Sequence, residues 1–144
     1  MKPIAARVSA TEYALAPREP DGWWLEISWR VHNDEDRPLY LVVTGPAAYE
    51  DTDPLLLDHT IREPDPYISP LTSVPFSFRE IPARRDVDLP QRYALPAWDF
   101  REPRRVIGRF GVGTERPEEN SSWEIAAAWQ TVVESEPISI GAGG

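Results

Sequence analysis

The sequence predicts an all-β fold in which short antiparallel strands form two sheets over a shared core. Sixteen prolines and eight glycines are scattered along the 144 residues and leave little room for a long helix. Several segments alternate apolar and polar residues with the period of two that marks a half-buried strand. Turn sequences such as PDG, NDEDRP and TERPEENSS separate these segments. Strands with one apolar and one polar face bury the apolar side by pairing two sheets, so a sandwich is expected.

Six segments have the strand pattern, and the last of them is broken by the Ser-Glu-Pro sequence at 135–137. They are residues 4–13, 23–33, 39–44, 74–81, 105–113 and 123–140. A chain of this length is long enough to bury a core of its own. We therefore expect one domain over residues 1–140, followed by a flexible glycine-rich tail at 141–144.

The second segment contains two adjacent tryptophans, which must point to opposite faces of a strand. One face carries five apolar side chains: Trp23, Leu25, Ile27, Trp29 and Val31. Trp24 alternates with polar residues and is expected to leave the core. The same alternation predicts two further inward sets: Val74, Phe76 and Phe78 in the fourth segment, and Val106, Phe110 and Val112 in the fifth, where Gly108 leaves a gap. Trp123 and Trp129 would share a core face if the last segment were a regular strand.

Two parts of the chain resemble a known family. The sequence VHNDEDRPLYL at 31–41 is similar to the B strand, turn and C strand of bacterial immunoglobulin-like and fibronectin-like domains. Residues 105–113, followed by WQTVVESEPISI at 129–140, resemble their F and G strands. This resemblance implies an immunoglobulin-like antiparallel β-sandwich of about seven to nine strands. Residues 46–99 and 114–122 would then be insertions, the first of them rich in proline.

Composition excludes several classes of function. The net charge of −9 argues against nucleic-acid binding, which needs a basic surface. The chain has no cysteine, and therefore no disulfide, thiolate nucleophile or cysteine-ligated metal. No apolar run predicts a secretion signal or a membrane span, so we expect a cytoplasmic protein that does not bind membranes.

No pattern of an enzyme or a cofactor site is found. The two histidines, His32 and His59, stand in no nucleophile motif and have no metal-ligand spacing, so we interpret them as structural or exposed. The acidic run 50–53 could offer oxygen atoms to calcium but lacks the glycine of a calcium loop. We expect no catalytic residue, metal or cofactor.

The segment 84–109 has the most unusual composition. Seven arginines face four carboxylates there, a net charge of +3 within an acidic chain, and Tyr93, Trp98 and Phe100 are interleaved with them. Tryptophan, tyrosine and arginine dominate the binding energy of protein interfaces. Two interpretations remain open: an interface for an acidic protein or peptide, or arginines that pair with the chain's own carboxylates while Trp98 and Phe100 close the end of the sandwich. The predicted partner-binding residues are Trp24, Arg84, Arg85, Trp98, Arg101, Arg104 and Arg105.

The sequence thus predicts a non-catalytic protein-interaction module, a subunit or adaptor of a larger cytoplasmic assembly. It would bind a protein partner through this loop surface of arginine and aromatic residues. The alternative is a small acidic inhibitor or immunity-type protein that acts through the proline-stiffened loop EPDPYISPLTSVP at 63–75. The oligomeric state is left open.

Overall fold

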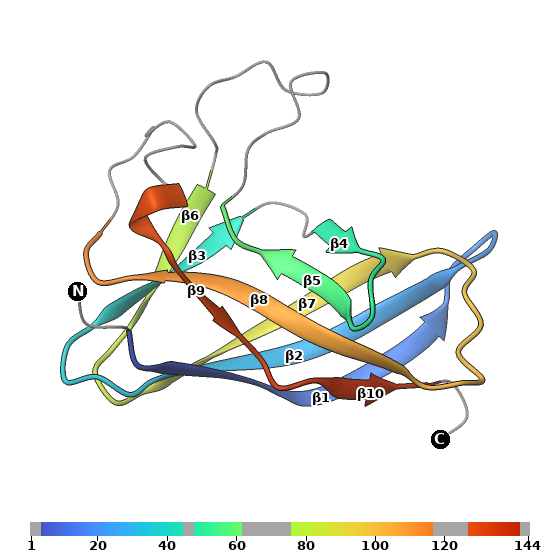
Figure 1. Cartoon of the computed structure of the whole chain (residues 1–144), viewed down its shortest axis with the longest axis horizontal. Helices are drawn as coiled ribbons and strands as arrows, with labels where there is room; N and C mark the ends of the chain where they lie inside the picture. The colour runs from blue at the N-terminus through green and yellow to red at the C-terminus, as the bar shows by residue number, and fades with distance from the viewer. Residues whose placement is uncertain (1–3, 45–47, 62–75, 117–126, 142–144) are drawn as a thin grey trace, which may run out of the picture.

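The computed structural model describes residues 4–44, 48–61, 76–116 and 127–141 (Figure 1). These residues form ten strands in two sheets and one helical turn at 127–129, which confirms the all-β prediction. The strands are β1 (Ala6–Pro17), β2 (Trp23–Asn33), β3 (Leu39–Thr44), β4 (Ala48–Glu50), β5 (Leu55–His59), β6 (Phe76–Ile81), β7 (Asp86–Leu95), β8 (Arg104–Gly113), β9 (Thr131–Glu134) and β10 (Ile138–Ile140).

The first sheet contains three antiparallel strands in the order β1-β2-β7. Along β2 the residues alternate between buried and more exposed positions as the period of two requires. Leu25, Ile27 and Trp29 are buried, whereas Trp24 lies on the outer face, so the predicted orientation of the tandem tryptophans is confirmed.

The second sheet is built around β8, which pairs with four other strands. β5 and β3 pair with β8 along successive parts of its length, and so do β10 and β9. β4 adds to β5, and β6 adds to β3. The break predicted at 135–137 is confirmed as the gap between β9 and β10. The β5–β8 pair is parallel, which departs from the expected antiparallel arrangement.

The core lies between the two sheets, and its largest fully buried side chain is Trp29. The gap predicted at Gly108 of β8 receives this indole. A Cβ atom on Gly108 would lie 2.7 Å from the Cη2 and Cζ2 atoms of Trp29, closer than real contacts allow. The ring of Phe110 meets the same indole edge-on at a centroid distance of 5.5 Å. The missing side chain of Gly108 is therefore what makes room for the tryptophan.

Three strands, β4, β5 and β7, were not predicted. β5 is the continuous run LLLDH, buried at every position, which is typical of a strand with both faces covered and shows no alternation. β7 contains Pro90, which argues against a central strand but is tolerated at a sheet edge. β7 is such an edge in the order β1-β2-β7. The segment between 84 and 104 was expected to be loop, and this was wrong for residues 86–95, which form β7.

The outer face of the second sheet carries a smaller apolar cluster. Val42 and Ile61 are buried there, with Trp129 packed against them. Trp129 belongs to the helical turn rather than to a strand, which corrects its expected place in the main core. Phe78 pairs with Val42 in the β3–β6 register and so shares this outer face, while Ile81 points into the main core. The inward prediction for Phe78 was wrong, because Ile81 has the opposite parity in the strand. The predictions for Val74 and Trp123 lie outside the described residues, as does the side chain of Phe76.

A chain of polar contacts crosses the main core between the two sheets. The indole Nε1 of Trp29 donates to the hydroxyl of Tyr93 on β7 at 2.9 Å, and that hydroxyl lies 2.5 Å from Nε2 of His59 on β5. The imidazole of His59 stacks on Phe110 with ring planes 3° apart. His59 is 4% exposed, so its predicted structural role is consistent with its position.

We expect Tyr93→Phe to lower the free energy of unfolding by about 1–3 kcal/mol at neutral pH, because the buried Trp29 N–H loses its acceptor. Burial raises the pKa of the Tyr93 hydroxyl above its ordinary value of 10.0. The folded chain then holds a proton that the unfolded chain releases above about pH 10, so this contribution to stability is complete below that pH and declines above it. Urea denaturation between neutral pH and the alkaline range measures the decline. A Tyr93→Phe variant with an unchanged alkaline slope would contradict this assignment.

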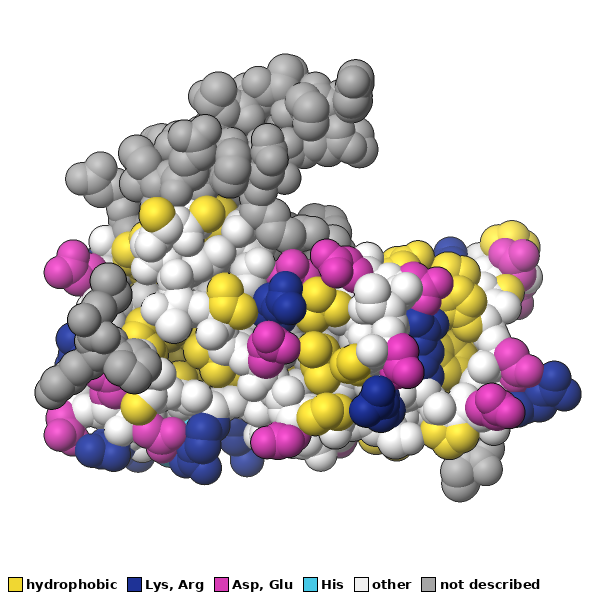
Figure 2. All heavy atoms as spheres, viewed as in Figure 1, with side chains coloured by type: hydrophobic (Ala, Val, Ile, Leu, Met, Phe, Trp, Pro, Cys, Tyr) yellow, Lys and Arg dark blue, Asp and Glu magenta, His cyan; other side chains and the backbone are white. Residues whose placement is uncertain are grey.

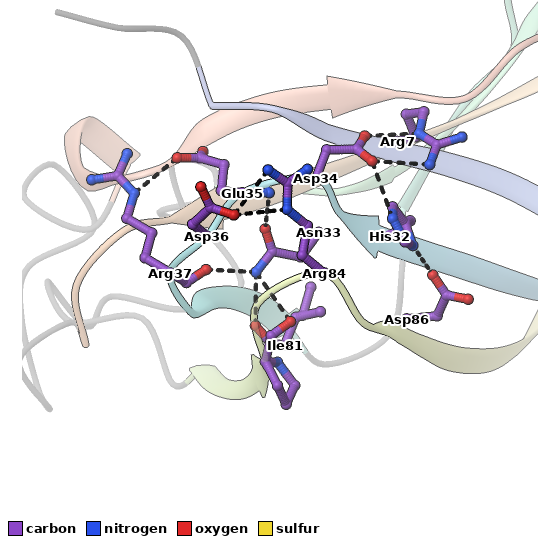
Figure 3. Close-up of polar contacts among 11 residues, drawn as sticks. Arg7, His32, Asn33, Asp34, Glu35, Asp36, Arg37, Ile81, Arg84 and Asp86 are labelled. Atoms are coloured by element: carbon purple, nitrogen blue, oxygen red, sulfur yellow. Dashed lines mark hydrogen bonds and ion pairs between the residues drawn. The ribbon is translucent and has the colours of Figure 1, made fainter.

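Asn33 closes the end of the molecule where the β2–β3 and β6–β7 turns meet (Figure 3). Its side chain is fully buried. The Nδ2 group donates to the carbonyl oxygens of Arg37, Ile81 and Pro82 at 2.8, 3.0 and 3.2 Å. Oδ1 accepts from the backbone N–H of Glu35 at 2.8 Å. One side chain therefore holds both turns together.

Candidate functional site

The predicted partner-binding residues fall into three separate places. Arg84 and Arg85 lie in the turn before strand β7, and Trp98 lies in the loop after it. Figure 1 shows that this strand is long and extends along the molecule. Ten extended residues span roughly 33 Å. Arg84 and Arg85 therefore lie at the opposite end of the molecule from Trp98, and the expected continuous surface from 84 to 109 does not form.

Trp98 is held in place at its end of the molecule by several contacts. Its carbonyl oxygen accepts a hydrogen bond of 2.8 Å from the indole Nε1 of Trp23, at the start of β2. The ring of Tyr49 on β4 approaches it edge-on at 5.5 Å, and the buried Phe100 lies 6.4 Å away. The indole remains half-buried at the surface. Trp98 is thus a fixed aromatic side chain rather than a mobile loop residue.

Two arginines at the start of β8 pair with the turn between β4 and β5, and one of them, Arg104, also contacts Trp98. The guanidinium of Arg104 lies 4.4 Å over the Trp98 ring, a cation–π contact. Arg104 also donates to the carboxylate of Asp51 and, at 3.1 Å, to the carbonyl of Thr52. Arg105 donates to Asp53 at 3.2 Å. The acidic run weighed as a calcium loop therefore serves as a set of ion-pair partners.

Arg101 in the same loop pairs with Asp99, two residues before it. Its Nη2 donates to Asp99 at 2.8 Å. The hydrogen bonds from the Arg101 side chain and then from its backbone N–H lower the pKa of Asp99 to about 2. Asp99 consequently keeps its negative charge throughout the neutral range.

We name these five residues, Tyr49, Trp98, Arg101, Arg104 and Arg105, the Trp98 surface. Figure 2 shows apolar side chains beside basic and acidic ones at this end of the molecule. Tyr49 is 37% exposed, and the arginine side chains are between 26% and 89% exposed. Each arginine of the surface has a carboxylate from the same chain, as the second interpretation of the segment expected. The surface therefore combines paired charges with aromatic side chains and is not simply basic.

Trp24 lies apart from this surface, on the outer face of the three-stranded sheet. The guanidinium of Arg92 on β7 stands 3.6 Å over its ring, and that of Arg18 is 5.7 Å from the same ring. Arg30 does not cover Trp24, because its guanidinium donates to Asp88 at 2.9 Å instead. Register explains the difference: Trp24 pairs with Ala94, next to Arg92 on the same face, whereas Arg30 pairs with Asp88.

Arg84 belongs to the turn at the other end of the molecule (Figure 3), and Arg85 is the next residue along the chain. Arg84 adopts a positive φ of 60° and donates to Asp36 at 2.9 Å. Nearby, His32 has a carboxylate at each ring nitrogen, Asp86 at Nδ1 and Asp34 at Nε2. Arg7 donates to Asp34 as well, and this bond lowers the pKa of Asp34.

The geometry offers no catalytic arrangement among the described residues. His59 is sealed in the core and His32 is bracketed by carboxylates. No group of three or more histidine or acidic residues in the described parts of the chain is placed to hold a metal ion. No helix there is long and apolar enough to cross a membrane.

Comparison of the chain with protein-family models, curated proteins and solved structures finds no match. Sequence reasoning found Trp98 and its arginines but missed Tyr49 and the roles of Asp51 and Asp53. The signal for Asp51 and Asp53 was present, because an acidic turn in a chain with clustered arginines indicates ion pairing as readily as metal binding.

Proposed function

We propose that the protein is a non-catalytic protein-interaction module, a subunit or adaptor of a cytoplasmic assembly, and that it binds its partner through the Trp98 surface. The observation that carries this proposal is the rigid presentation of Trp98. Its backbone is tied to Trp23 and its ring lies between Arg104 and Tyr49. Half-buried aromatic and arginine side chains that are already ordered lose little entropy on binding.

The ion pairs of the surface define the chemistry of the partner. Arg101, Arg104 and Arg105 each form an ion pair with an aspartate, and Arg104 also lies over the Trp98 ring. Because these charges cancel locally, we expect a partner that contributes an apolar or aromatic group to the centre and polar groups to the rim. A strongly acidic partner would have to displace the chain's own carboxylates.

The immunoglobulin-like character of the fold is part of the same proposal. Two sheets over one core, and a last strand split into β9 and β10 beside β8, support it. The parallel β5–β8 pair is a departure from that family's pattern. Loops at the end of a rigid sandwich are common binding sites, and the Trp98 surface lies at such an end.

The test uses two charge-reversed variants, one at each end of the molecule. Arg101→Glu/Arg105→Glu changes the Trp98 surface, and Arg84→Glu/Arg85→Glu is the matched control. The protein is crosslinked in lysate of its native host, and captured proteins are identified by mass spectrometry. We expect one partner with the wild type and the control, reduced about tenfold or more with the first variant. Equal capture by both variants, loss only in the control, or no partner at all would overturn the proposal.

The alternative of an inhibitor was assigned to the loop at 63–75, which lies outside the described residues. No described residue favours it, so a second function is not proposed.

A further inference from the structure

The outer face of the three-stranded sheet holds a hollow of about 520 Å³ to which all three strands contribute. Small-molecule sites typically measure roughly 300–1,000 Å³. Six of its residues form two rows across the sheet in the register of the strands. They are Glu12, Ser28 and Pro90 in one row and Ala14, Glu26 and Arg92 in the next.

Small side chains explain why this flat sheet face is hollowed. The side chains of Ala14, Ser28 and Pro90 are short and extend less far from the sheet than the neighbouring side chains of Glu12, Glu26 and Arg92. The next row is Ala16, Trp24 and Ala94, so Trp24 stands on the same face next to Arg92, just outside the residues that line the hollow. The site lies on the face of the sheet, so it is distinct from the Trp98 surface.

Arg92 is held in position but keeps hydrogen-bonding capacity. Its guanidinium stacks on Trp24 at 3.6 Å, which restrains its orientation. The distance from its Nε to Oε1 of Glu26 is 3.7 Å, longer than a hydrogen bond. The two side chains are 55% and 63% exposed. Several donors of Arg92 and the carboxylate oxygens of Glu26 thus remain available to a ligand.

The charges of the hollow select the class of ligand. Glu12 and Glu26 would repel an anion, and Arg92, 3.7 Å from Glu26, offsets one of the two carboxylates and so weakens the attraction for a cation. A neutral ligand whose groups both donate and accept hydrogen bonds satisfies the carboxylates and the guanidinium together. Hydroxyl groups have this property, and the C–H faces of a sugar ring can pack on the small apolar floor.

We propose that this hollow is a binding site for a neutral carbohydrate, with Glu12, Glu26 and Arg92 contacting hydroxyl groups and Trp24 positioning Arg92. The proposal is independent of the protein partner assigned to the Trp98 surface.

The test is calorimetric titration of the full chain with maltohexaose, cellohexaose, xylohexaose and chitohexaose, up to roughly 10 mM to detect weak binding. A heparin hexasaccharide and hexalysine serve as the anionic and cationic probes. We expect at least one neutral oligosaccharide to bind, and its affinity to fall about tenfold or more in Glu26→Ala and in Arg92→Ala. Arg30→Ala is the matched control, because Arg30 lies on the same face of β2 in an ion pair but outside the hollow.

Circular dichroism of each variant establishes that these exposed substitutions leave the fold intact. Binding that is lost in Glu26→Ala and Arg92→Ala and kept in Arg30→Ala supports the site. Three results would overturn it: no binding of any neutral oligosaccharide, equal binding by all three variants, or binding of a charged probe in place of the neutral ones.

Discussion

Replacing Gly108 by alanine is expected to lower the free energy of unfolding by about 1–3 kcal/mol, although it adds only one methyl group. The new Cβ would lie 2.7 Å from two atoms of Trp29 and 3.1 Å from Cε2 of Phe110. Trp29 is fully buried, so its indole has no free space into which it can move. Trp29→Ala is expected to cost more, about 3–5 kcal/mol, because it empties the centre of the core.

A double-mutant cycle separates this contact from a general intolerance of β8. The clashing atoms Cη2 and Cζ2 belong to the far edge of the indole, which phenylalanine lacks. Gly108→Ala is therefore expected to cost much less in a Trp29→Phe background, with a coupling energy of about 1–2 kcal/mol from urea denaturation. Additive costs would show that Trp29 does not occupy the space that Gly108 leaves.

Asn33→Ala is expected to cost roughly 3 kcal/mol, the second large effect. The substitution leaves carbonyl groups of two turns and the N–H of Glu35 without their side-chain partner, and each buried unsatisfied group costs about 1–3 kcal/mol. A solvent-exposed neighbour provides the control: Arg37→Gln keeps the backbone carbonyl that Asn33 uses and should change stability by less than about 0.5 kcal/mol.

Asn33→Asp distinguishes the donor role of the side chain from its acceptor role. Aspartate keeps an oxygen for the Glu35 N–H but directs a negative charge at the carbonyls of Arg37, Ile81 and Pro82. We expect it to be at least as destabilising as alanine in the same denaturation experiment. A milder effect of aspartate would mean that the bond to Glu35 is the important one.

The strands that were predicted from the sequence are those with one buried face, because their residues alternate between apolar and polar. β2 alternates strictly, and its boundaries and the orientation of Trp24 follow from that alternation. β5 was not predicted because a strand that is covered on both faces does not alternate between apolar and polar residues. β7 was not predicted because Pro90 argues against a strand, although proline is tolerated in an edge strand. Phe78 was assigned to the wrong face because the outer face of the second sheet also carries an apolar cluster. The alternation of residues within one strand does not show which of two apolar faces is the main core.

The sequence predicted which kinds of residue form the candidate site, but not which of them lie together in the structure. Arginine and aromatic residues of 84–109 indicated an interface, yet β7 carries the two ends of that segment to opposite ends of the molecule. The aspartates that pair with Arg104 and Arg105 lie more than fifty residues earlier in the chain. Such long-range pairing depends on the parallel β5–β8 contact, for which the sequence has no local signal.

The central claim is that the partner binds at the Trp98 surface, and amide and indole chemical-shift mapping tests it most directly. The labelled protein is titrated with the captured partner and observed by two-dimensional NMR. The account predicts that the largest changes occur at Trp98, Tyr49 and Arg105, while the side-chain amide of Asn33 and the backbone of Arg84 at the other end are unchanged. Changes centred on Asn33 and Arg84, with the indole signal of Trp98 unaffected, would contradict it.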